Sequence, residues 1–497
     1  MKKILLLLTM VLTTVGAWAQ VSKLEDGKYY KIKGTHSTNP WLTGVVESGG
    51  IDVSSIEADA GIYQWTEGRL RELITGKYIG TTNGQITLVS NSNTTTIESS
   101  DNGRLLIKNG GRYLYNNQAD YTREAGNLTA AGADAPKWRF YEVTPVFTID
   151  NKYNGRGTLC FGNWSGSEYF ALTDITLSGY TSNNVNVTDP KNKYWYITRT
   201  NNGLYIYNIG KGRFLQPRAA EKATCTSVFA KGFDGEYRSK NNKFYISFKS
   251  SNYYLSFSCG WAPNSANGNV RWLTNNEEAA TLLTLTNVTA DGVTTMANDA
   301  ESLIKAYETP HTLNISEVGY ASLYLGYPAQ IPNGVEAYIV KEDGIKNGYV
   351  MLDQVTGVLP AKTGVILKAS QAGYTFSCSL SDVADVEGNL LQGTTTEKYV
   401  QGEAYVLSAK NGIGLYKAEL NNEGNFINNA NKAYLPASAV ANSNVKAFLF
   451  ETGETTAIET VETENANAPI YDLSGRRVLS TVKGGIYIQN GKKFIVK

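Results

Sequence analysis

The chain has little of the chemistry that most enzymes rely on. Its 497 residues include only 2 histidines, His36 and His311, and 4 cysteines. Neither histidine stands in a His-x-x-x-His, a His-Glu or a Gly-x-Ser-x-Gly setting, and no C-x-x-C pair occurs. The sequence therefore gives no support to zinc hydrolysis, to a Ser-His-Asp triad or to a structural zinc site. We predict a protein that is not an enzyme, with no catalytic residues, no metal and no cofactor.

An excess of charge of one sign and long apolar runs are also missing. The formal net charge is +1 and no basic run stands out, which argues against binding to nucleic acid. Beyond the first residues no stretch approaches the ~18 apolar residues of a membrane-spanning helix, so we predict no integral membrane span. Proline is scarce at 12 residues, whereas 48 glycines and 32 tyrosines are present. Aromatic residues with many turn glycines are typical of short, twisted strands.

The few cysteines leave the redox chemistry open. Cys160, Cys225 and Cys259 fall in one predicted module, and Cys378 lies further along. A disulfide among the first three would suit an oxidising compartment, and unpaired buried thiols suit the sequence equally well.

The N-terminus has the pattern of an export signal. Met1-Lys2-Lys3 is basic, residues 4–15 are largely apolar, and Ala17-Trp18-Ala19 gives an A-x-A site before Gln20. These are the three parts of a secretory signal peptide. We therefore predict a signal peptide at 1–19, with cleavage after Ala19, and a mature protein that is secreted or displayed at the cell surface.

Two kinds of strand recur along the first 290 residues. One carries a tryptophan, and the other is an aromatic-aliphatic strand followed by a Gly turn, as at 105–114, 204–215 and 244–255. A hairpin unit repeated at roughly 35–45 residues predicts β units that share one core, because no single hairpin can bury its own apolar face. The tryptophans predicted to be buried in these cores are Trp65, Trp138, Trp195 and Trp272.

The first module, 20–145, resembles the ricin-type β-trefoil lectins, and 146–290 repeats its plan. The resemblance is carried by Gln64-Trp65, by Gly68-Arg69-Leu70-Arg71 and by Gly76-Lys77-Tyr78-Ile79. The sequence departs from the family's Q-x-W motif, because Gln64 stands directly beside Trp65 and the other tryptophans lack the glutamine. The family's sugar-pocket residues have no residue-by-residue counterpart here. The resemblance implies two tandem β-trefoil-like modules.

A helix is predicted after the two modules. Residues 298–308 place Leu303, Ile304 and Tyr307 on one helical face, Asn298 or Asp299 can cap the start, and Pro310 ends the pattern. We assign 291–310 to a helical connector that packs against the edge of a module.

The rest of the chain stays rich in strand patterns. We assign 311–451 to a β-sandwich-like region, because several turn signals separate its strands. The strands are predicted at 320–325, 336–340, 364–368, 404–407 and 447–450. Similar domains precede the C-terminal signal of many secreted Bacteroidetes proteins, a resemblance that implies no activity. Residues 452–468 are polar and rich in Glu, Thr and Asn, which predicts a linker.

The C-terminal tail, 469–497, carries a specific pattern. It runs from Ile470-Tyr471-Asp472-Leu473-Ser474-Gly475 through Gly484-Gly485 to a basic end, which predicts three short strands joined by Gly turns. It resembles the C-terminal sorting domain of the Bacteroidetes type IX secretion system. The resemblance implies export by the Sec pathway to the periplasm, passage across the outer membrane, and the secretion machinery as a partner. An ordinary terminal hairpin is the alternative.

The predicted fold class is all-β. It comprises two tandem β-trefoil-like modules, a β-sandwich-like region and a small C-terminal β sorting domain.

Three loops, at 113–121, 163–169 and 261–269, mix aromatic side chains with amides or acids. A sugar site needs an aromatic face for stacking and polar groups for the hydroxyls. The candidate ligand-binding residues are Tyr115, Asn117, Asp120, Trp164, Glu168, Tyr169, Trp261 and Asn264. The alternative is that the aromatics belong to the module cores and that the amides are turn residues.

The leading hypothesis is a non-catalytic protein that binds a glycan or glycoprotein through its β-trefoil-like modules. The second is a structural or adhesive surface protein, or a protease inhibitor, that binds protein partners. The third is a glycoside hydrolase, because paired carboxylates can act on any β scaffold. Its candidate pairs are Glu142 with Asp150 and Glu168 with Asp174, which look instead like strand-face and loop acids.

Overall fold

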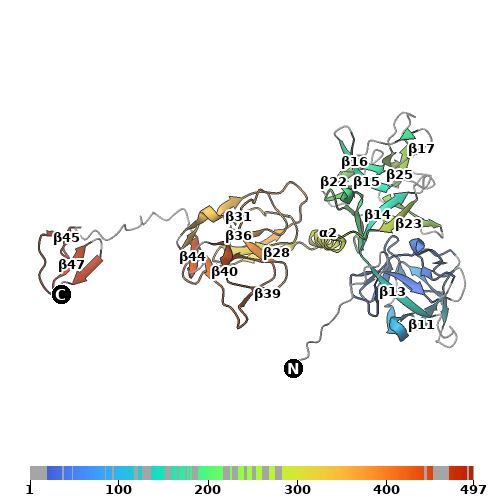
Figure 1. The fold of residues 1–497 in the computed structure, drawn as a ribbon, viewed down its shortest axis with the longest axis horizontal. Helices are drawn as coiled ribbons and strands as arrows, with labels where there is room; N and C mark the ends of the chain where they lie inside the picture. Colours follow the sequence, from blue (N-terminus) through green and yellow to red (C-terminus); the bar gives the residue numbers. More distant parts are fainter. Residues whose placement is uncertain are drawn as a thin grey trace, which may run out of the picture.

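The chain is a series of β-rich units with a helix between the second and the third (Figure 1). The computed structural model describes residues 19–495 except for the segments 36–37, 48, 84, 92–93, 117–120, 126–135, 152–157, 165–166, 174–175, 178–179, 182–188, 217–223, 227–232, 240–242, 249–252, 260–267, 275–281, 347, 441–444, 451–468 and 490–491. Within the described residues α2 (Val293–Glu308) is the single α-helix, and no helix there is long and apolar enough to cross a bilayer. The prediction of an all-β chain is confirmed.

The second module is built on a closed ring of strands. Its strands are β14 (Val146–Asn151), β15 (Thr158–Trp164), β16 (Ser167–Thr173), β19 (Trp195–Thr200), β20 (Gly203–Asn208), β21 (Arg213–Gln216), β22 (Thr224–Thr226), β23 (Phe233–Ser239), β24 (Lys243–Phe248), β25 (Tyr253–Cys259), β26 (Gly268–Thr274) and β27 (Leu283–Asn287), with a separate short pair β17 (Thr176–Leu177) and β18 (Tyr180–Thr181). Antiparallel pairing runs round the ring in the order β14–β19–β20–β23–β24–β27, and β27 returns to β14. The chain enters and leaves at one place, where the Val288 N–H donates to the Val146 carbonyl at 3.0 Å.

Three hairpins extend from this ring, and we call them the cap hairpins. They are β15–β16, β21–β22 and β25–β26, each joined to one ring strand. Each third of the module therefore contributes two ring strands and one cap hairpin. This three-fold plan is that of a β-trefoil, so the second module is β-trefoil-like.

The first module follows the same plan. Its strands are β1 (Gln20–Val21), β2 (Tyr29–Gly34), β3 (Trp41–Leu42), β4 (Val53–Ser54), β5 (Tyr63–Thr66), β6 (Arg69–Glu72), β7 (Tyr78–Thr82), β8 (Gln85–Val89), β9 (Thr96–Ser99), β10 (Leu105–Asn109), β11 (Arg112–Tyr115), β12 (Arg123–Ala125) and β13 (Lys137–Val143). The ring is β2–β5–β6–β9–β10–β13, and β13 pairs with β2. The Thr95 N–H, which donates to the Gly68 carbonyl at 2.9 Å, joins the segments that lead into β9 and β6.

Tryptophan indoles fix the hairpins to the rings in both modules. Trp138 and Trp195 are fully buried, and each donates its Nε1–H to a leucine carbonyl on a cap hairpin of the same repeat. The acceptors are Leu114 for Trp138 and Leu159 for Trp195, both at 3.0 Å. A buried indole needs such an acceptor, because an unpaired buried donor is costly. The predicted burial of these two tryptophans is confirmed.

Trp65 is also mostly buried, but less completely than Trp138 and Trp195. Trp65 lies on β5, where it packs against the first-module core from its edge, and its backbone N–H donates to the Lys28 carbonyl at 2.9 Å. Trp272 lies on β26, and its side chain is outside the described part of the chain.

The two modules dock through two buried arginines. Arg199 on β19 donates from Nε to the Leu73 carbonyl at 2.9 Å and from Nη2 to the Ile74 carbonyl. Arg71 on β6 donates in return from Nη2 to the Arg199 carbonyl at 2.5 Å. Charge-assisted bonds to carbonyls are directional, so these contacts set the orientation of one module against the other.

A buried carboxylate completes this contact. Glu72 is fully buried and accepts a bond from the Tyr237 hydroxyl of the second module at 2.8 Å. Its other oxygen accepts from the backbone N–H and the hydroxyl of Thr75, at 2.7 and 2.8 Å. Burial raises the pKa of Glu72 above its usual value, although these bonds oppose the shift.

Glycines allow the two modules to approach at backbone distance. A Cβ on Gly44 would lie 2.5 Å from the Tyr237 ring, and one on Gly235 would lie 2.4 Å from Cγ2 of Ile74. Gly76 has φ +71, and a Cβ there would lie 2.8 Å from Cδ of Arg199. All three glycines therefore belong to the docking surface between the modules.

The helix α2 is longer than predicted. It begins after Gly292, which is in the left-handed conformation at φ 75, and not at Asn298 or Asp299, which lie inside it. The predicted face is otherwise present, since Leu303 and Ile304 are buried and Tyr307 packs against the same core. At the C-terminal end of α2, Glu308 accepts bonds from Thr200, Asn202 and Tyr205 of the second module, the last two at 2.9 Å.

The third region is a β-sandwich-like fold. Its strands are β28 (His311–Ile315), β29 (Tyr320–Tyr324), β30 (Ala329–Gln330), β31 (Val335–Ile339), β32 (Ile345–Lys346), β33 (Tyr349–Val350), β34 (Asp353–Val355), β35 (Val358–Leu359), β36 (Gly364–Ala369), β37 (Ala372–Phe376), β38 (Gln392–Thr394), β39 (Lys398–Gln401), β40 (Ala404–Ser408), β41 (Gly414–Lys417), β42 (Asn425–Asn428), β43 (Lys432–Pro436) and β44 (Ala447–Phe450). A four-stranded sheet, β29–β36–β31–β34, and a seven-stranded sheet, β32–β33–β44–β41–β40–β43–β38, form its two layers. Ile366 of the first sheet packs with Leu415 and Leu435 of the second in one buried cluster.

The tail forms a small sheet of its own, at the far end of the chain in Figure 1. Its strands are β45 (Ile470–Tyr471), β46 (Arg477–Val478), β47 (Ile486–Gln489) and β48 (Lys492–Ile495), in the order β46–β45–β47–β48. The prediction of three strands is wrong by one, because 470–478 folds back on itself. Asp472 drives that turn, since its Oδ1 accepts from the Ser474 hydroxyl at 2.6 Å and from the backbone N–H groups of Ser474 and Arg476. The Ser474 hydroxyl bond is the main reason that the pKa of Asp472 falls to about 2.

Candidate functional site

The three predicted recognition loops all fall on cap hairpins. The loop at 113–121 spans β11 and the approach to β12, the loop at 163–169 joins β15 to β16, and the loop at 261–269 leads into β26. The cap hairpins lie outside the ring of strands that forms the core of each module, so their residues are candidates for contact with a ligand.

The register of the β15–β16 hairpin distributes its residues between two faces. Trp164 pairs with Ser167, Asn163 with Glu168, and Gly162 with Tyr169. Directly opposite residues share a face and neighbours along a strand alternate, so Trp164 and Tyr169 lie on the same face and Glu168 on the other. Two of the three predicted residues of this loop are therefore diagonal neighbours.

The second and third loops belong to adjacent hairpins. β16 pairs with β26 through Ala171 and Asn269, which makes β15–β16–β26–β25 a continuous four-stranded ribbon. Asn269 ends the third loop, and Ala171 is two residues beyond Tyr169. Because β16 and β26 are antiparallel, the Trp164–Ser167 end of the first hairpin and the Cys259–Gly268 end of the second lie toward opposite ends of this ribbon, and Asn269 is the third-loop residue that comes near Tyr169. Trp261 and Asn264 lie outside the described residues.

The described part of the loop in the first module makes contacts within its own module. Tyr115 is half-buried on β11 opposite Arg123, and Asn116 is buried, with Nδ2 donating to the Asn39 carbonyl at 2.6 Å. The neighbouring Tyr113 donates its hydroxyl to Glu98 at 3.1 Å. These contacts favour a packing role for the described part of this loop. Asn117 and Asp120 lie outside the described residues.

The carboxylates considered for glycoside hydrolysis have local partners. Glu142 forms an ion pair with Lys28 at 3.1 Å, at the surface of the first module. Asp150 accepts bonds from the hydroxyls of Thr158 at 2.8 Å and Thr286 at 2.9 Å, across strands of the second module. Glu168 is on β16, and Asp174 lies outside the described residues.

Over the part of the chain that the structure describes, no group of three or more His, Cys, Asp and Glu side chains could hold a metal ion. Burial lowers the pKa of His311, and nearby Lys432 lowers it further. His36 lies outside the described residues. Cys160 is buried, and Cys378 is a free thiol whose pKa burial raises to about 12.

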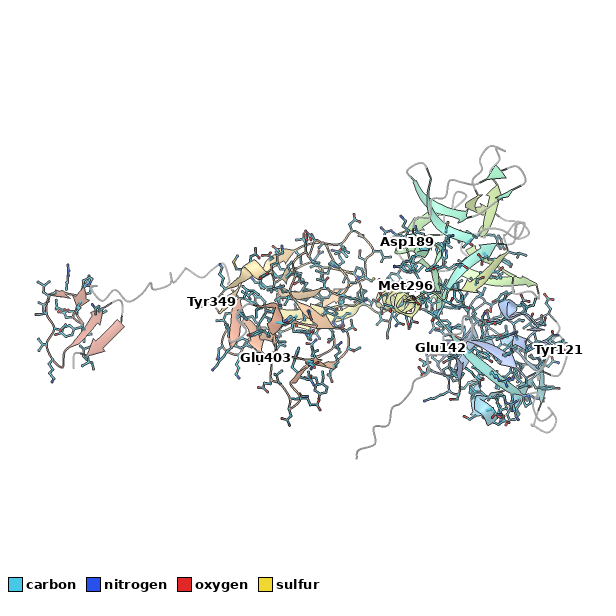
Figure 2. The ribbon with its side chains drawn as sticks, viewed as in Figure 1. Tyr121, Glu142, Asp189, Met296, Tyr349 and Glu403 are labelled. Atoms are coloured by element: carbon cyan, nitrogen blue, oxygen red, sulfur yellow. The ribbon has the colours of Figure 1, made fainter. Side chains whose placement is uncertain are left out.

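Sequence reasoning missed a cavity where the second module, α2 and the third region meet. It has a volume of about 320 Å³ and is lined by Tyr207 and Arg213 of the second module, Leu303 of α2, and Pro328, Lys362 and Leu380 of the third region. In Figure 2 the labelled Met296 marks α2 between the second module and the third region. No local pattern could have predicted this cavity, because its walls come from segments far apart in the chain.

No protein-family model matches the chain, and no curated protein matches it. Solved structures give weak likenesses. A Polyporus squamosus lectin, described as bound to a human-type influenza-binding epitope, is 12% identical over 34% of this chain and 56% of its own, with a TM-score of 0.22. An Abrus precatorius agglutinin is 13% identical over 53% of this chain and 98% of its own, with a TM-score of 0.20.

A further likeness is to an enzyme. A GlcNAcα1-4Gal-releasing endo-β-galactosidase from Clostridium perfringens is 10% identical over 53% of this chain and 73% of its own, with a TM-score of 0.22. The chain thus spans little more than half the length of the Polyporus lectin. At these scores the likenesses carry no conclusion, and the β-trefoil-like description rests on the strand pairing.

Proposed function

We propose that the chain is a non-catalytic carbohydrate-binding protein that recognises a glycan or glycoconjugate through the cap hairpins of its second module. The observation that supports this proposal is the pairing of β16 with β26, which places two aromatic-amide loops on one ribbon. A sugar ring needs an aromatic surface for its C–H face and polar groups for its hydroxyls. Trp164 and Tyr169, at diagonal positions of the hairpin, would supply the first requirement, and Asn269, which pairs with Ala171 two residues beyond Tyr169, would supply the second.

Glycan-array binding by the full mature chain tests this proposal. Trp164→Ala and Tyr169→Ala should each weaken binding by about 1–3 kcal/mol, which is the value of a well-packed aromatic contact. Tyr349→Ala is the matched control, because Tyr349 is an exposed aromatic of the third region. Retention of the glycan by both hairpin variants at the level of the control would contradict the proposal.

A protein partner remains the second candidate. The two-stranded sheet β39–β42 of the third region holds Tyr399 and Ile427 as directly opposed residues, with 64% and 49% of their surfaces exposed. Exposed apolar pairs on a two-stranded ribbon suit adhesion to another protein. Loss of cell or matrix adhesion in Tyr399→Ser, together with unchanged glycan binding, would favour this alternative.

We also propose that the tail directs the chain to the cell surface or the medium through the type IX secretion machinery. Register places Tyr471, Ile486 and Ile495 on one face of its sheet, and each is more than a third exposed. Six basic residues and one acidic residue lie between 469 and 497. An exposed apolar face with a basic surround supports recognition by another protein.

Deletion of 470–497 tests the tail. In a host with this secretion system, the truncated chain should fold normally and accumulate in the periplasm, while the full chain reaches the surface or the medium. Normal delivery of the truncated chain would reduce the tail to a terminal hairpin pair.

A further inference from the structure

The cavity between the second module, α2 and the third region has the walls of a preformed binding site. Tyr207, Leu303 and Leu380 line it, and each is at least nine-tenths buried within the same hydrophobic cluster. The Tyr207 ring packs against Phe214 with the centroids 4.9 Å apart. These walls are held by core packing on both sides, so the space between them does not depend on a single loop.

The charge on the cavity lining is unbalanced. Lys362 is paired with Asp299, with Nζ and Oδ1 2.8 Å apart. Arg213 donates from Nη1 to two neutral carbonyls, those of Leu380 at 3.2 Å and Gly212 at 3.3 Å. Within the described residues no carboxylate pairs with Arg213, so the lining carries one positive charge that nothing there neutralises.

The bonding of Arg213 leaves a specific edge of its guanidinium available. Both of these bonds use Nη1, and within the described residues Nε and Nη2 have no acceptor. Two parallel N–H groups on one edge match the two oxygens of a carboxylate. The bond to Leu380, from the opposite side of the junction, holds the guanidinium in place before any ligand arrives.

We propose that this cavity binds a small carboxylate with an apolar body, such as an aryl or branched aliphatic acid. The carboxylate would lie on the Nε–Nη2 edge of Arg213, and the apolar body would pack against Tyr207, Leu303 and Leu380. The volume of about 320 Å³ is roughly twice the ~150 Å³ that accommodates benzene, so it holds one ring with a short acid arm. Arg213 lies at the start of the cap hairpin β21–β22, which is neither of the two hairpins in the glycan proposal, and the site goes beyond the glycan binding proposed above.

A ligand in this cavity would also stabilise the contact between the second module and the third region. Its walls come from three parts of the chain, which the ligand would join in addition to the Lys362–Asp299 and Arg213–Leu380 contacts. Binding only to the docked arrangement stabilises that arrangement by mass action. A bound acid should therefore protect the contact between the second module and the third region.

Ligand-observed saturation-transfer NMR on the full chain tests the proposal, with 3-phenylpropanoate as the probe and 3-phenylpropanamide as its uncharged counterpart. The acid should bind, and the amide should bind at least tenfold more weakly. Arg213→Gln should weaken binding of the acid at least tenfold, whereas Arg139→Gln, on β13 of the first module, should leave it unchanged. Equal affinity for acid and amide, or no transfer to the acid, would overturn the assignment.

A second variant keeps the test decisive if the Arg213→Gln protein does not fold. Val383 lines the cavity and is 51% exposed, so Val383→Trp adds bulk at the rim without disturbing the core. This variant should keep the thermal unfolding midpoint of the parent and lose at least tenfold in affinity for the acid. Unchanged affinity in a folded Val383→Trp protein would overturn the assignment. Glycan binding should persist in both cavity variants, which separates this site from the hairpin site.

Discussion

Replacing Arg199 with methionine is expected to weaken the contact between the two modules. Methionine keeps an unbranched apolar stem but donates no hydrogen bond, so the bonds from Nε to the Leu73 carbonyl and from Nη2 to the Ile74 carbonyl are lost. A hydrogen bond to a charged group contributes about 1.5–3 kcal/mol, and a buried carbonyl left unpaired adds a desolvation cost. The two bonds together predict a loss of about 3–5 kcal/mol in the free energy of unfolding.

Chemical denaturation of the full chain measures this loss. Hydrogen exchange at residues 73–76 should also accelerate, because the loss is localised there. Arg139→Met is the matched control, since Arg139 is half-exposed on β13 and its replacement should change stability by no more than about 0.5 kcal/mol. If Arg199→Met unfolds at the same denaturant concentration as this control, the two bonds do not hold the modules together and the reasoning fails.

Three more predictions follow from single buried groups. Folding raises the pKa of Glu72 above 4.5, so above that pH the folded state still holds a proton that the unfolded state has released. The free energy of unfolding should therefore fall as pH rises from about 4.5 through the folded pKa. Glu72→Gln should flatten this pH dependence in denaturation curves taken at several pH values. Trp195→Phe should lower the free energy of unfolding by about 2–4 kcal/mol, because it removes the indole bond to the Leu159 carbonyl and opens a cavity. The same change at the less buried Trp65 should lower it by less than about 1.5 kcal/mol. Equal losses of the two variants in thermal unfolding would contradict this reasoning. Because burial raises the pKa of Cys378 to about 12, little thiolate is present at pH 8, and alkylation by iodoacetamide should be at least about tenfold slower than that of an ordinary thiol of pKa 9.0, as peptide mass spectrometry can measure.

Local patterns in the sequence predict the strands well. The strand expected at 336–340 is β31 (Val335–Ile339), and that expected at 364–368 is β36 (Gly364–Ala369). Alternating apolar residues and turn glycines carry this information within a few residues of each strand. The sequence did not predict the start of α2, because Val293, Thr294 and Thr295 are β-branched and favour strands. The first turn of this helix therefore depends on tertiary packing.

The contacts between units could not be predicted from the sequence. Arg71 and Arg199 sit in strand patterns where a charged residue normally faces water, and only the docking of two rings buries them. The cavity at Arg213 is likewise formed by segments more than one hundred residues apart. The pairing of β16 with β26 belongs to the same class, because the register between distant hairpins depends on closure of the whole ring.

The point where each ring opens to the chain has a consequence for how such a protein can be rearranged. In the second module the entering and leaving segments are hydrogen-bonded neighbours at Val146 and Val288, and in the first module Tyr29 pairs directly with Val143. Because the entering and leaving segments of a module are adjacent, removing or duplicating the module leaves the flanking chain ends only about one strand spacing apart, roughly 5 Å. Such a module can therefore be inserted or removed as one unit. The same closeness allows a short connection to join the ends of the first module while new termini open at a hairpin turn. A gene encoding such modules can change their number or order without redesigning any core.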